Sequence, residues 1–203
     1  ELSDLLGQMV GEISALHTYV WDGDVRTGPD DIAASFLGAV TTRSEAAGGF
    51  KVDYIYRSDP QQPEFLSPLA RPNVGVSIGD VITRVNGVPT MSFTCLEEPL
   101  RRMAGKQVLL TVVTPQSQQE RNVIVEPISV DEARGLRYRD WEYTRRLEVE
   151  DMSNNEIGYV HLRETATSDY GQWVRDFYPV FNRKGLIIDM RHNYGGQIDS
   201  WII

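Results

Sequence analysis

Apolar residues near the N-terminus recur at steps of three and four, which is the pattern of an amphipathic helix. The stripe consists of Leu2, Leu5, Leu6, Met9, Val10, Ile13 and Leu16. It leads into His17 and then into the acidic, glycine-containing sequence WDGD at residues 21–24. His17 is therefore expected where a helix gives way to a loop, a frequent place for a catalytic side chain. A partly buried or helix-capping histidine is the alternative interpretation.

From about residue 31 the pattern changes to short strands and turns. Residues 50–56 alternate with a period of two, which predicts a half-buried strand. Residues 81–85 predict another strand, which the Asn-Gly pair at residues 86–87 ends, because these residues supply the positive φ angles of a hairpin turn. The other elements predicted here are a helix at 96–103 and strands at 108–114 and 122–127.

The C-terminal part predicts a strand, a helix and a second strand, over residues 157–162, 170–181 and 186–191. The apolar run at residues 186–188 is typical of a strand that is buried on both faces of an α/β layer. A further helix is expected from Gln197 onward. These elements imply a βαβ-type unit, in which ligands gather at the carboxyl ends of the strands.

Gly195 and Gly196 follow the second strand and precede the last predicted helix. Free N–H groups point outward at a helix N-terminus, and glycine lets a ligand approach them closely. Such donors can stabilise the negative oxygen of an acyl-transfer intermediate by ~3 kcal/mol each. A plain tight turn is the alternative. A phosphate loop of the Walker type is excluded, because the Lys and Ser/Thr of that pattern are missing.

Composition narrows the classes of function. The 203 residues are 41% hydrophobic and 24% charged, as in an ordinary globular protein. The formal charge of −9 disfavours nucleic acid as a partner, and no apolar run approaches the ~20 residues that span a membrane. The single cysteine, Cys95, excludes an internal disulfide and fits a reducing compartment. We therefore expect a cytoplasmic protein, with a periplasmic one as the alternative, and no metal or cofactor.

The segment VGVSIGDVITRVNGVP at residues 74–89, followed by a predicted helix and two strands, resembles a PDZ domain of the circularly permuted kind found in proteases. An unrelated small β domain with one Asn-Gly hairpin is the alternative. The resemblance implies that a peptide binds by adding as a strand to the edge of the sheet. The loop before that edge strand would fall near Phe36, Leu37 and Gly38.

Three further segments resemble the tail-specific, or C-terminal processing, serine proteases, and within that group the tricorn proteases. They are GEISALHTYV at residues 11–20, the proline-rich phrase at residues 56–72, and LIIDMRHNYGG at residues 186–196. Their order along the chain also matches the family. The resemblance implies an α+β multidomain fold with three parts. These are an N-terminal helical segment (residues 1–30), an inserted PDZ-like β domain (31–128) and the beginning of a crotonase-like α/β catalytic domain (129–203).

By this resemblance the chain is expected to be a fragment of a serine endopeptidase that hydrolyses peptides. His17 would be the general base, although Leu16 stands where the family often has Ser. Gly195 or Gly196, foremost Gly195, would supply an oxyanion-hole amide.

Other polar residues near the glycines are interpreted as structural. Asp189, Arg191 and Asn193 match the family motif, and an Asp–Arg pair or a side-chain hydrogen bond to the turn would explain them. His161 lies on a predicted strand and matches no catalytic position of the family.

The nucleophilic serine of the family lies beyond the glycine turn, after another helix and strand. We therefore expect it outside these 203 residues, since Ser200 is too close to the glycines. The chain by itself is expected not to hydrolyse peptides. Its expected partners are peptides or unfolded protein tails, with neither nucleic acid nor membrane, and the family implies a homo-oligomeric parent protein.

Two rival functions remain open. One is a PDZ-type adaptor or degenerate protease that binds peptide tails without cutting them. The other is a crotonase-like α/β protein of different chemistry, which would leave the PDZ-like insertion unexplained. A Gly-Ser-type nucleophile element downstream of residue 203 would favour the enzyme over the adaptor, and its absence would favour the adaptor.

Overall fold

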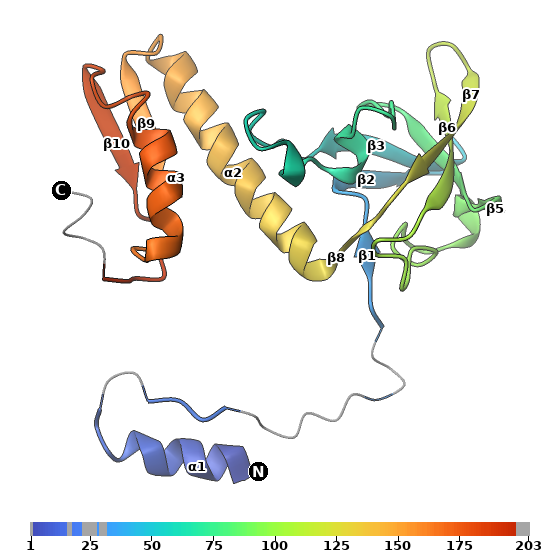
Figure 1. The fold of residues 1–203 in the computed structure, drawn as a ribbon. Coiled ribbons are helices and arrows are strands. Elements are labelled where there is room, and N and C mark those ends of the chain that lie inside the picture. The colour runs from blue at the N-terminus through green and yellow to red at the C-terminus, as the bar shows by residue number, and fades with distance from the viewer. Residues whose placement is uncertain (1, 16–17, 22–27, 29–31, 198–203) are drawn as a thin grey trace. The chain divides into compact units, whose positions relative to one another are not determined.

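The computed structural model describes residues 2–15, 18–21, 28 and 32–197 (Figure 1). Two compact units make up the chain, Glu1–Ile32 and Ala33–Ile203. In the first unit, helix α1 (Leu2–Gly11) confirms the predicted amphipathic helix but ends before Leu16. Its Leu5 and Met9 side chains are exposed within this unit. No helix in the described part of the chain has both the length and the apolar character needed to cross a membrane.

The second unit begins with a β-rich domain around one antiparallel sheet (Figure 1). Its strands lie in the order β2-β3-β4-β6-β7, and β5 pairs with β4. β2 forms one edge, because it pairs with β3 and with no other described strand. The bounds are β2 Ala39–Ser44, β3 Gly49–Ile55, β4 Val81–Val85, β5 Val88–Pro89, β6 Val108–Thr114 and β7 Gln119–Val125. Short 3-10 helices lie at η1 Pro63–Phe65, η2 Pro68–Ala70 and η3 Thr90–Ser92.

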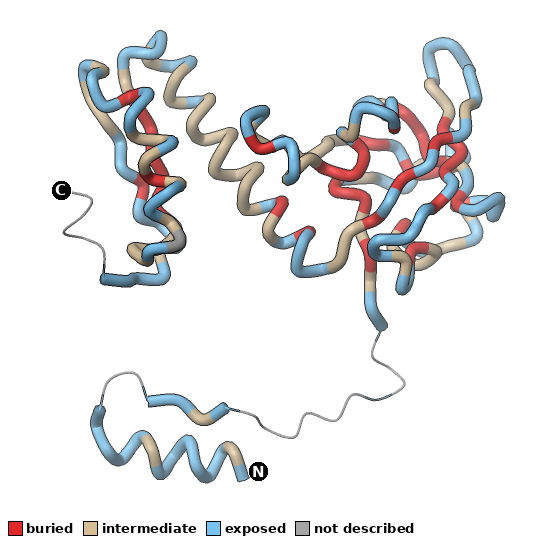
Figure 2. The backbone as a smooth tube through the Cα atoms, viewed as in Figure 1, coloured by how far each residue is buried: buried red, intermediate tan, exposed pale blue. Residues whose placement is uncertain are grey.

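The hairpin between β4 and β5 confirms the predicted Asn-Gly turn. Asn86 has a φ of 49° and Gly87 a φ of 81°, the left-handed pair that a two-residue hairpin requires. Asn86 also joins the turn to β6, since its N–H donates to Leu109 O (2.7 Å) and its Oδ1 accepts from Leu109 N–H (2.9 Å). Figure 2 shows many buried residues along the strands of this sheet. The most deeply buried core side chains include Val52, Ile82, Leu100, Val108, Leu110 and Val112.

The helix predicted over residues 96–103 is wrong, because this segment forms a chain of turns. Pro99 lies inside it, and proline disfavours the α conformation at the residue before it and lacks a donor of its own. The hydrogen bonds span three residues, as from Leu100 N–H to Glu97 O (3.1 Å), and Arg102 is left-handed with a φ of 58°. Leu96 and Leu100 still reach the core from these turns.

A long helix leads out of the β-rich domain. β1 (Ser35–Phe36) pairs antiparallel with β8 (Ile128–Ser129), and β8 runs directly into α2 (Val130–Met152), which the sequence analysis did not predict. Ser129 Oγ accepts from Glu132 N–H (3.3 Å), and Glu132 Oε2 accepts from Ser129 N–H (2.8 Å). This reciprocal capping box satisfies two backbone donors at the start of the helix.

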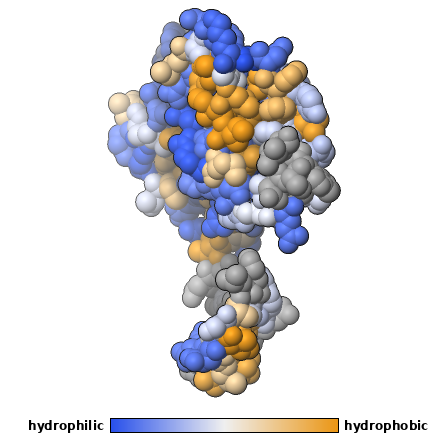
Figure 3. All heavy atoms as spheres, turned by 90° about the vertical axis from the view of Figure 1, so that its left-hand side faces the viewer, coloured by the Kyte–Doolittle hydropathy of each residue, from blue (hydrophilic) through white to orange (hydrophobic). Residues whose placement is uncertain are grey.

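The remaining elements form the predicted βαβ unit. β9 (Ile157–His161) and β10 (Gly185–Asp189) are parallel, and α3 (Thr167–Phe177) connects them. Trp173 of α3 packs on β9, in a small core with Val160. The expected burial of β10 on both faces is wrong: Ile187 is 44% and Ile188 45% exposed, because β9 is the only described strand beside β10. Figure 3 views the molecule from the side on which β10 lies in Figure 1 and shows apolar residues gathered there.

Candidate functional site

The two predicted glycines lie in one turn just beyond β10. Thr165 N–H donates to Gly195 O (2.8 Å), and Gln197 N–H donates to Thr165 O (2.7 Å), so Gly196 forms a parallel bridge with Thr165. The backbones are so close that a Cβ on Gly196 would lie 2.1 Å from Thr165 O, and the φ of Gly196 is +146°. Only glycine fits this position without moving the backbone.

The amides of the two glycines differ in their surroundings. Gly195 N–H donates to Asn193 Oδ1 (2.7 Å), and Asn193 Nδ2 donates to Leu162 O (2.8 Å), which ties the turn to the end of β9. Gly196 N–H has no acceptor among the described residues, and in a parallel bridge it points away from Thr165. With respect to the described residues, an incoming anion would therefore find Gly196 N–H unoccupied and would compete with Asn193 for Gly195 N–H.

Asp189, the last residue of β10, holds the base of this turn. Its carboxylate accepts from Tyr159 Oη (2.7 Å) and from Arg191 N–H and Nε (3.0 and 2.9 Å). The Asp189 side chain is 6% exposed, whereas that of Arg191 is 61% exposed. Hydrogen bonds from Arg191 hold the pKa of Asp189 well below its usual range, and burial followed by the Asp189 contact raises the pKa of Tyr159. These are contacts expected of residues that shape a turn.

His161 is fully engaged in structural contacts. Its Nδ1 lies 2.8 Å from Asp189 O, and its Nε2 lies 2.6 Å from Tyr138 Oη. A carbonyl only accepts, so Nδ1 carries the hydrogen, and in the neutral ring Tyr138 donates to Nε2. The side chain is 2% exposed, which leaves it no access to a substrate.

Two aromatic side chains from α2, Tyr138 and Trp141, lie against the ends of β9 and β10. The Trp141 ring packs edge-to-face with the rings of His161 (centroids 5.0 Å apart) and His192 (5.5 Å). Arg191 lies over the Trp141 ring, with its guanidinium carbon 5.1 Å from the centroid. The sequence analysis missed Tyr138 and Trp141. The signals that could have found them are the capping-box spacing at Ser129 and the proline-free stretch after it.

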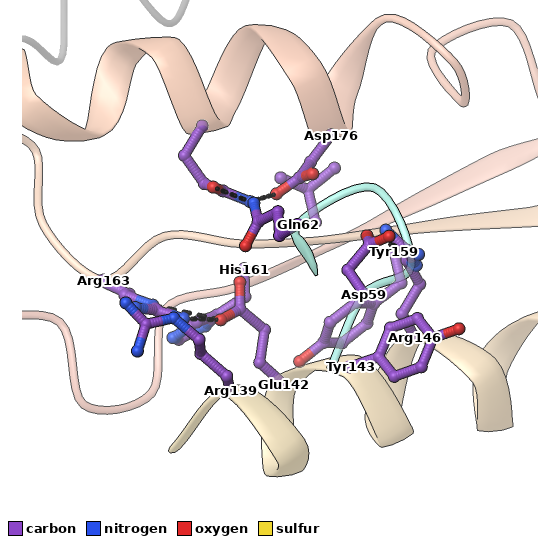
Figure 4. A pocket seen from close by; sticks show the side chains of 12 residues that line it. Asp59, Gln62, Arg139, Glu142, Tyr143, Arg146, Tyr159, His161, Arg163 and Asp176 are labelled. Atoms are coloured by element: carbon purple, nitrogen blue, oxygen red, sulfur yellow. Dashed lines mark hydrogen bonds and ion pairs between the residues drawn. The ribbon is translucent and has the colours of Figure 1, made fainter. Parts of the chain in front are cut away.

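A small polar cavity of about 30 Å³ lies between α2, α3, β9 and the segment before η1 (Figure 4). This volume has room for a water molecule. Gln172 Nε2 donates to Asp176 (2.5 Å) and its Oε1 accepts from Gln62 (3.0 Å), while Arg163 Nε donates to Glu142 (3.1 Å). Burial raises the pKa of Asp176. Two ion pairs belong to its lining, Arg163 with Glu142 and Arg146 with Asp59.

The same region joins the β-rich domain to α2. Tyr54 Oη donates to Asp140 (2.7 Å), and the N–H of Arg57 donates to the same carboxylate (2.6 Å). Burial, together with the Asp140 contact, raises the pKa of Tyr54 to about 12. Arg146 of α2 also pairs with Asp59 at 2.9 Å. These polar contacts fix the domain against the middle of the helix.

A second, larger cavity of about 290 Å³ runs along the edge strand β2. Phe36 and Gly38 line it, whereas Leu37 is 5% exposed and belongs to the core. Gly38 has a φ of +69°, and a Cβ there would lie 2.5 Å from Ser67 Oγ, which itself donates to Gly38 O (2.7 Å). The loop before β2 is thus held in one shape. We call this cavity the β2 groove; its lining residues are Phe36, Gly38, Ala39, Val40, Thr41, Phe50, Tyr56, Cys95, Leu96, Glu97, Ala133 and Arg137.

The structure thus places Gly195 and Gly196 in one turn, and Phe36 and Gly38 on the β2 groove. His17 lies outside the described residues. Within the described part, no three His, Cys, Asp or Glu side chains are grouped to hold a metal ion.

Comparison with known proteins supports both the PDZ-like domain and the segment that contains the glycine turn. The family model of the tricorn protease PDZ domain matches residues 36–130, and that of peptidase family S41 matches residues 156–203. The chain is 33% identical, over its full length, to tricorn protease homolog 1 of Streptomyces coelicolor and covers 19% of that protein. It is 29% identical, again over its full length, to the tricorn protease homolog of Saccharolobus solfataricus and covers 18% of it.

The fold agrees with the sequence comparisons. A crystal structure of the tricorn protease superposes with a TM-score of 0.80 over 99% of this chain and 19% of the other, at 23% identity. The chain therefore spans about a fifth of the length of the relatives that it matches. Over its full length the chain is thus similar to the tricorn proteases and their homologues, with a segment that matches the tricorn protease PDZ domain followed by one that matches peptidase family S41.

Proposed function

We propose that this chain contributes a peptide-binding domain and part of the active site to a serine endopeptidase. The observation that carries the proposal is the Gly195–Gly196 turn. It lies at the carboxyl ends of two parallel strands, inside the segment that matches peptidase family S41, and the Gly196 N–H has no acceptor among the described residues. Ligands of α/β sheets bind at this edge.

In the proposed mechanism His17 is the general base. It takes the proton of a serine hydroxyl that lies beyond Ile203, and the serine oxygen attacks the peptide carbonyl carbon. The carbonyl oxygen becomes an oxyanion, and Gly196 N–H, joined by Gly195 N–H when it leaves Asn193, donates hydrogen bonds to it. His17 then gives the proton to the amine as the C–N bond breaks, which leaves an acyl-enzyme; water, activated by the same histidine, hydrolyses this ester and frees the serine. Asp189 and Asn193 act only by holding the turn in place.

The PDZ domain has the proposed role of binding the peptide. The edge of β2 that pairs with no described strand can accept a further strand through main-chain hydrogen bonds, and the β2 groove provides room for its side chains. The rival adaptor function requires the same peptide binding, without cleavage.

The test uses the full-length protein that the gene encodes. It is labelled with a fluorophosphonate, which reacts with activated serine, and its hydrolysis of fluorogenic peptides is measured. His17→Ala and Gly196→Ala should each lower both signals by about 100-fold or more. Arg134→Gln, an exposed change on α2, is the control and should leave both intact. Peptide binding without any labelling or hydrolysis would establish the adaptor and refute the enzyme. Retention of hydrolysis in His17→Ala would refute the assigned base.

A further inference from the structure

Tyr194 stands directly before the two glycines of the turn, and its side chain is open to solvent. At 82%, its exposed fraction is the largest among the large apolar and aromatic residues that the structure describes. Its ring and hydroxyl have no ring contact or hydrogen bond to another described residue. Exposure by itself is ordinary for a single aromatic residue. The place of Tyr194 in the fold is what gives this exposure a meaning.

The backbone around Tyr194 is held firmly although its ring is free. Tyr194 N–H donates to Arg163 O (2.9 Å). The next residue is held on both sides, since Gly195 N–H donates to Asn193 Oδ1 (2.7 Å) and Gly195 O accepts from Thr165 N–H (2.8 Å). A free side chain on a loop that is positioned by a rigid scaffold is typical of a binding residue.

Tyr194 lies within reach of a peptide bound at the glycine amides. Two residues of extended chain span at most about 7 Å, so the Cα atoms of Tyr194 and Gly196 are no farther apart than that. A peptide whose carbonyl oxygen accepts from Gly196 N–H therefore brings the side chains next to its scissile bond within reach of the Tyr194 ring. Gly195 and Gly196 have no side chains, so Tyr194 provides the only side chain of residues 194–196.

The Tyr194 hydroxyl lies on the side of the turn that faces α2. Burial raises the pKa of Tyr138, the charge of Arg163 opposes this shift, and Tyr194 adds to it. Tyr138 also packs edge-to-face against the exposed His192, with ring centroids 6.4 Å apart. Aromatic rings thus border the turn on this side, and a substrate side chain there meets apolar faces.

The cations at this end of the strands are already paired. Arg191 Nη2 lies 2.5 Å from the Asp189 carboxylate, and Arg163 Nε donates to Glu142 (3.1 Å). An acidic substrate side chain would therefore compete with two existing carboxylates.

Two carboxylates follow β9 in the segment that packs on the turn. Glu164 and Asp169 form no ion pair with the described residues, but Asp169 accepts from Glu164 N–H (2.7 Å). They make a cationic side chain the competing class of substrate residue. A large apolar side chain gains more by leaving water against an aromatic ring than a cation gains at an exposed ring, so the apolar class is favoured.

We propose that Tyr194 is a specificity-determining residue, whose ring packs on a large apolar or aromatic side chain next to the scissile bond. This inference rests on the peptidase function proposed above and gives it a substrate class. Because the ring makes the contact, the hydroxyl is dispensable and phenylalanine should replace the tyrosine.

The test uses the full-length protein that the gene encodes and fluorogenic peptides that differ at one residue. The residue before or after the cleaved bond is Ala, Leu, Phe, Lys or Glu, and kcat/KM is measured for each peptide. The variants are Tyr194→Ala, Tyr194→Phe and the control Tyr178→Ala. Tyr178 is also an exposed tyrosine (59%), but it lies at the C-terminal end of α3, before β10 begins. The rate of fluorophosphonate labelling is measured in parallel, because it reports on the active serine without a substrate side chain.

The wild type, Tyr194→Phe and Tyr178→Ala should cleave the Leu or Phe peptide roughly tenfold or more faster than the Ala peptide at one of the two positions. In Tyr194→Ala this ratio should fall to about threefold or less, while labelling and cleavage of the Ala peptide stay within about twofold of the wild type.

A preference for Leu or Phe that persists in Tyr194→Ala would overturn the role of Tyr194 and leave the peptidase function standing. So would a wild type that prefers Lys or Glu, or that has no preference. Loss of labelling in Tyr194→Ala would show that the ring supports the turn itself, which also overturns the specificity role. If the wild type is neither labelled nor active, the peptidase function and the role of Tyr194 both fail.

Discussion

The Gly195–Gly196 turn allows a sharp test, because two adjacent glycines should respond differently to the same added methyl group. In Gly196→Ala the new Cβ would lie 2.1 Å from Thr165 O and 2.2 Å from the Thr165 carbonyl carbon. These are backbone atoms, so no side-chain rotation relieves the clash. In Gly195→Ala the Cβ meets nothing within 4 Å, and the φ of +83° is the main cost.

The size of the difference follows from two hydrogen bonds. Moving the backbone at Gly196 breaks the bonds from Thr165 N–H to Gly195 O and from Gln197 N–H to Thr165 O. Each contributes about 0.5–1.5 kcal/mol, so the turn should open more easily by about 1–3 kcal/mol. Gly195→Ala should cost about 1 kcal/mol or less, since alanine also loses less backbone entropy on folding than glycine.

The assay is hydrogen exchange of the Thr165 and Gln197 amides, followed by NMR. Gly196→Ala should speed their exchange by about 5-fold to 150-fold, whereas Gly195→Ala should speed it by about 5-fold at most. The Leu110 amide, in the buried strand β6, serves as the internal control and should not change in either variant. Equal acceleration in both variants would refute the claim that close approach to Thr165 is what requires glycine at residue 196.

Three further predictions concern stability and the β2 groove. The pKa of Asp189 is lower in the folded protein than in the unfolded chain, so its stabilising contribution is present above about pH 4 and is lost as the pH falls further. In urea unfolding, the difference in free energy of unfolding between wild type and Asp189→Asn should therefore be constant from about pH 7 to 5 and shrink toward pH 2. A difference that grows in acid would contradict this. Ser129→Ala should lower the free energy of unfolding by about 1 kcal/mol through loss of the capping box, with Ser129→Thr as the tolerated control, and equal losses in both would argue against the cap. Cys95 lines the groove, so a bound peptide should slow its alkylation by maleimide several-fold in native protein but not in urea, and unchanged labelling would show that the peptide binds elsewhere.

Local sequence patterns were sufficient for most of the fold. The alternation at residues 50–56, the Asn-Gly pair at 86–87 and the apolar run before the glycines each predicted an element that the structure contains. These signals come from interactions between neighbouring residues, such as the positive φ at Asn86 and Gly87. The error at residues 96–103 came from weighing apolar spacing above Pro99, although a single proline suffices to break a helix.

The contacts that build the candidate site could not be predicted in this way. The partners of His161 are Tyr138, 23 residues earlier, and the carbonyl of Asp189, 28 residues later. No local pattern specifies such pairs, because they depend on how a helix and two strands meet in space. By contrast, the Asp189–Arg191 pair and the hydrogen bond from Gly195 N–H to Asn193 join residues only two apart, and the sequence analysis did expect contacts of this kind.

Helix α2 contributes residues to both candidate sites, and its composition explains why the sequence analysis missed it. Periodicity finds helices that bury one face, but α2 buries only Ala133 and Leu136 and is otherwise rich in charged residues. Its partners lie on several sides: Arg137 lines the β2 groove, while Tyr138 contacts His161 at the end of β9. A helix that connects two packing regions needs polar side chains around most of its surface, so it has no single apolar stripe. The property that hid α2 from the sequence pattern is therefore the one that places a contact with the β2 groove and a contact with the end of β9 on consecutive residues, Arg137 and Tyr138, of one helix.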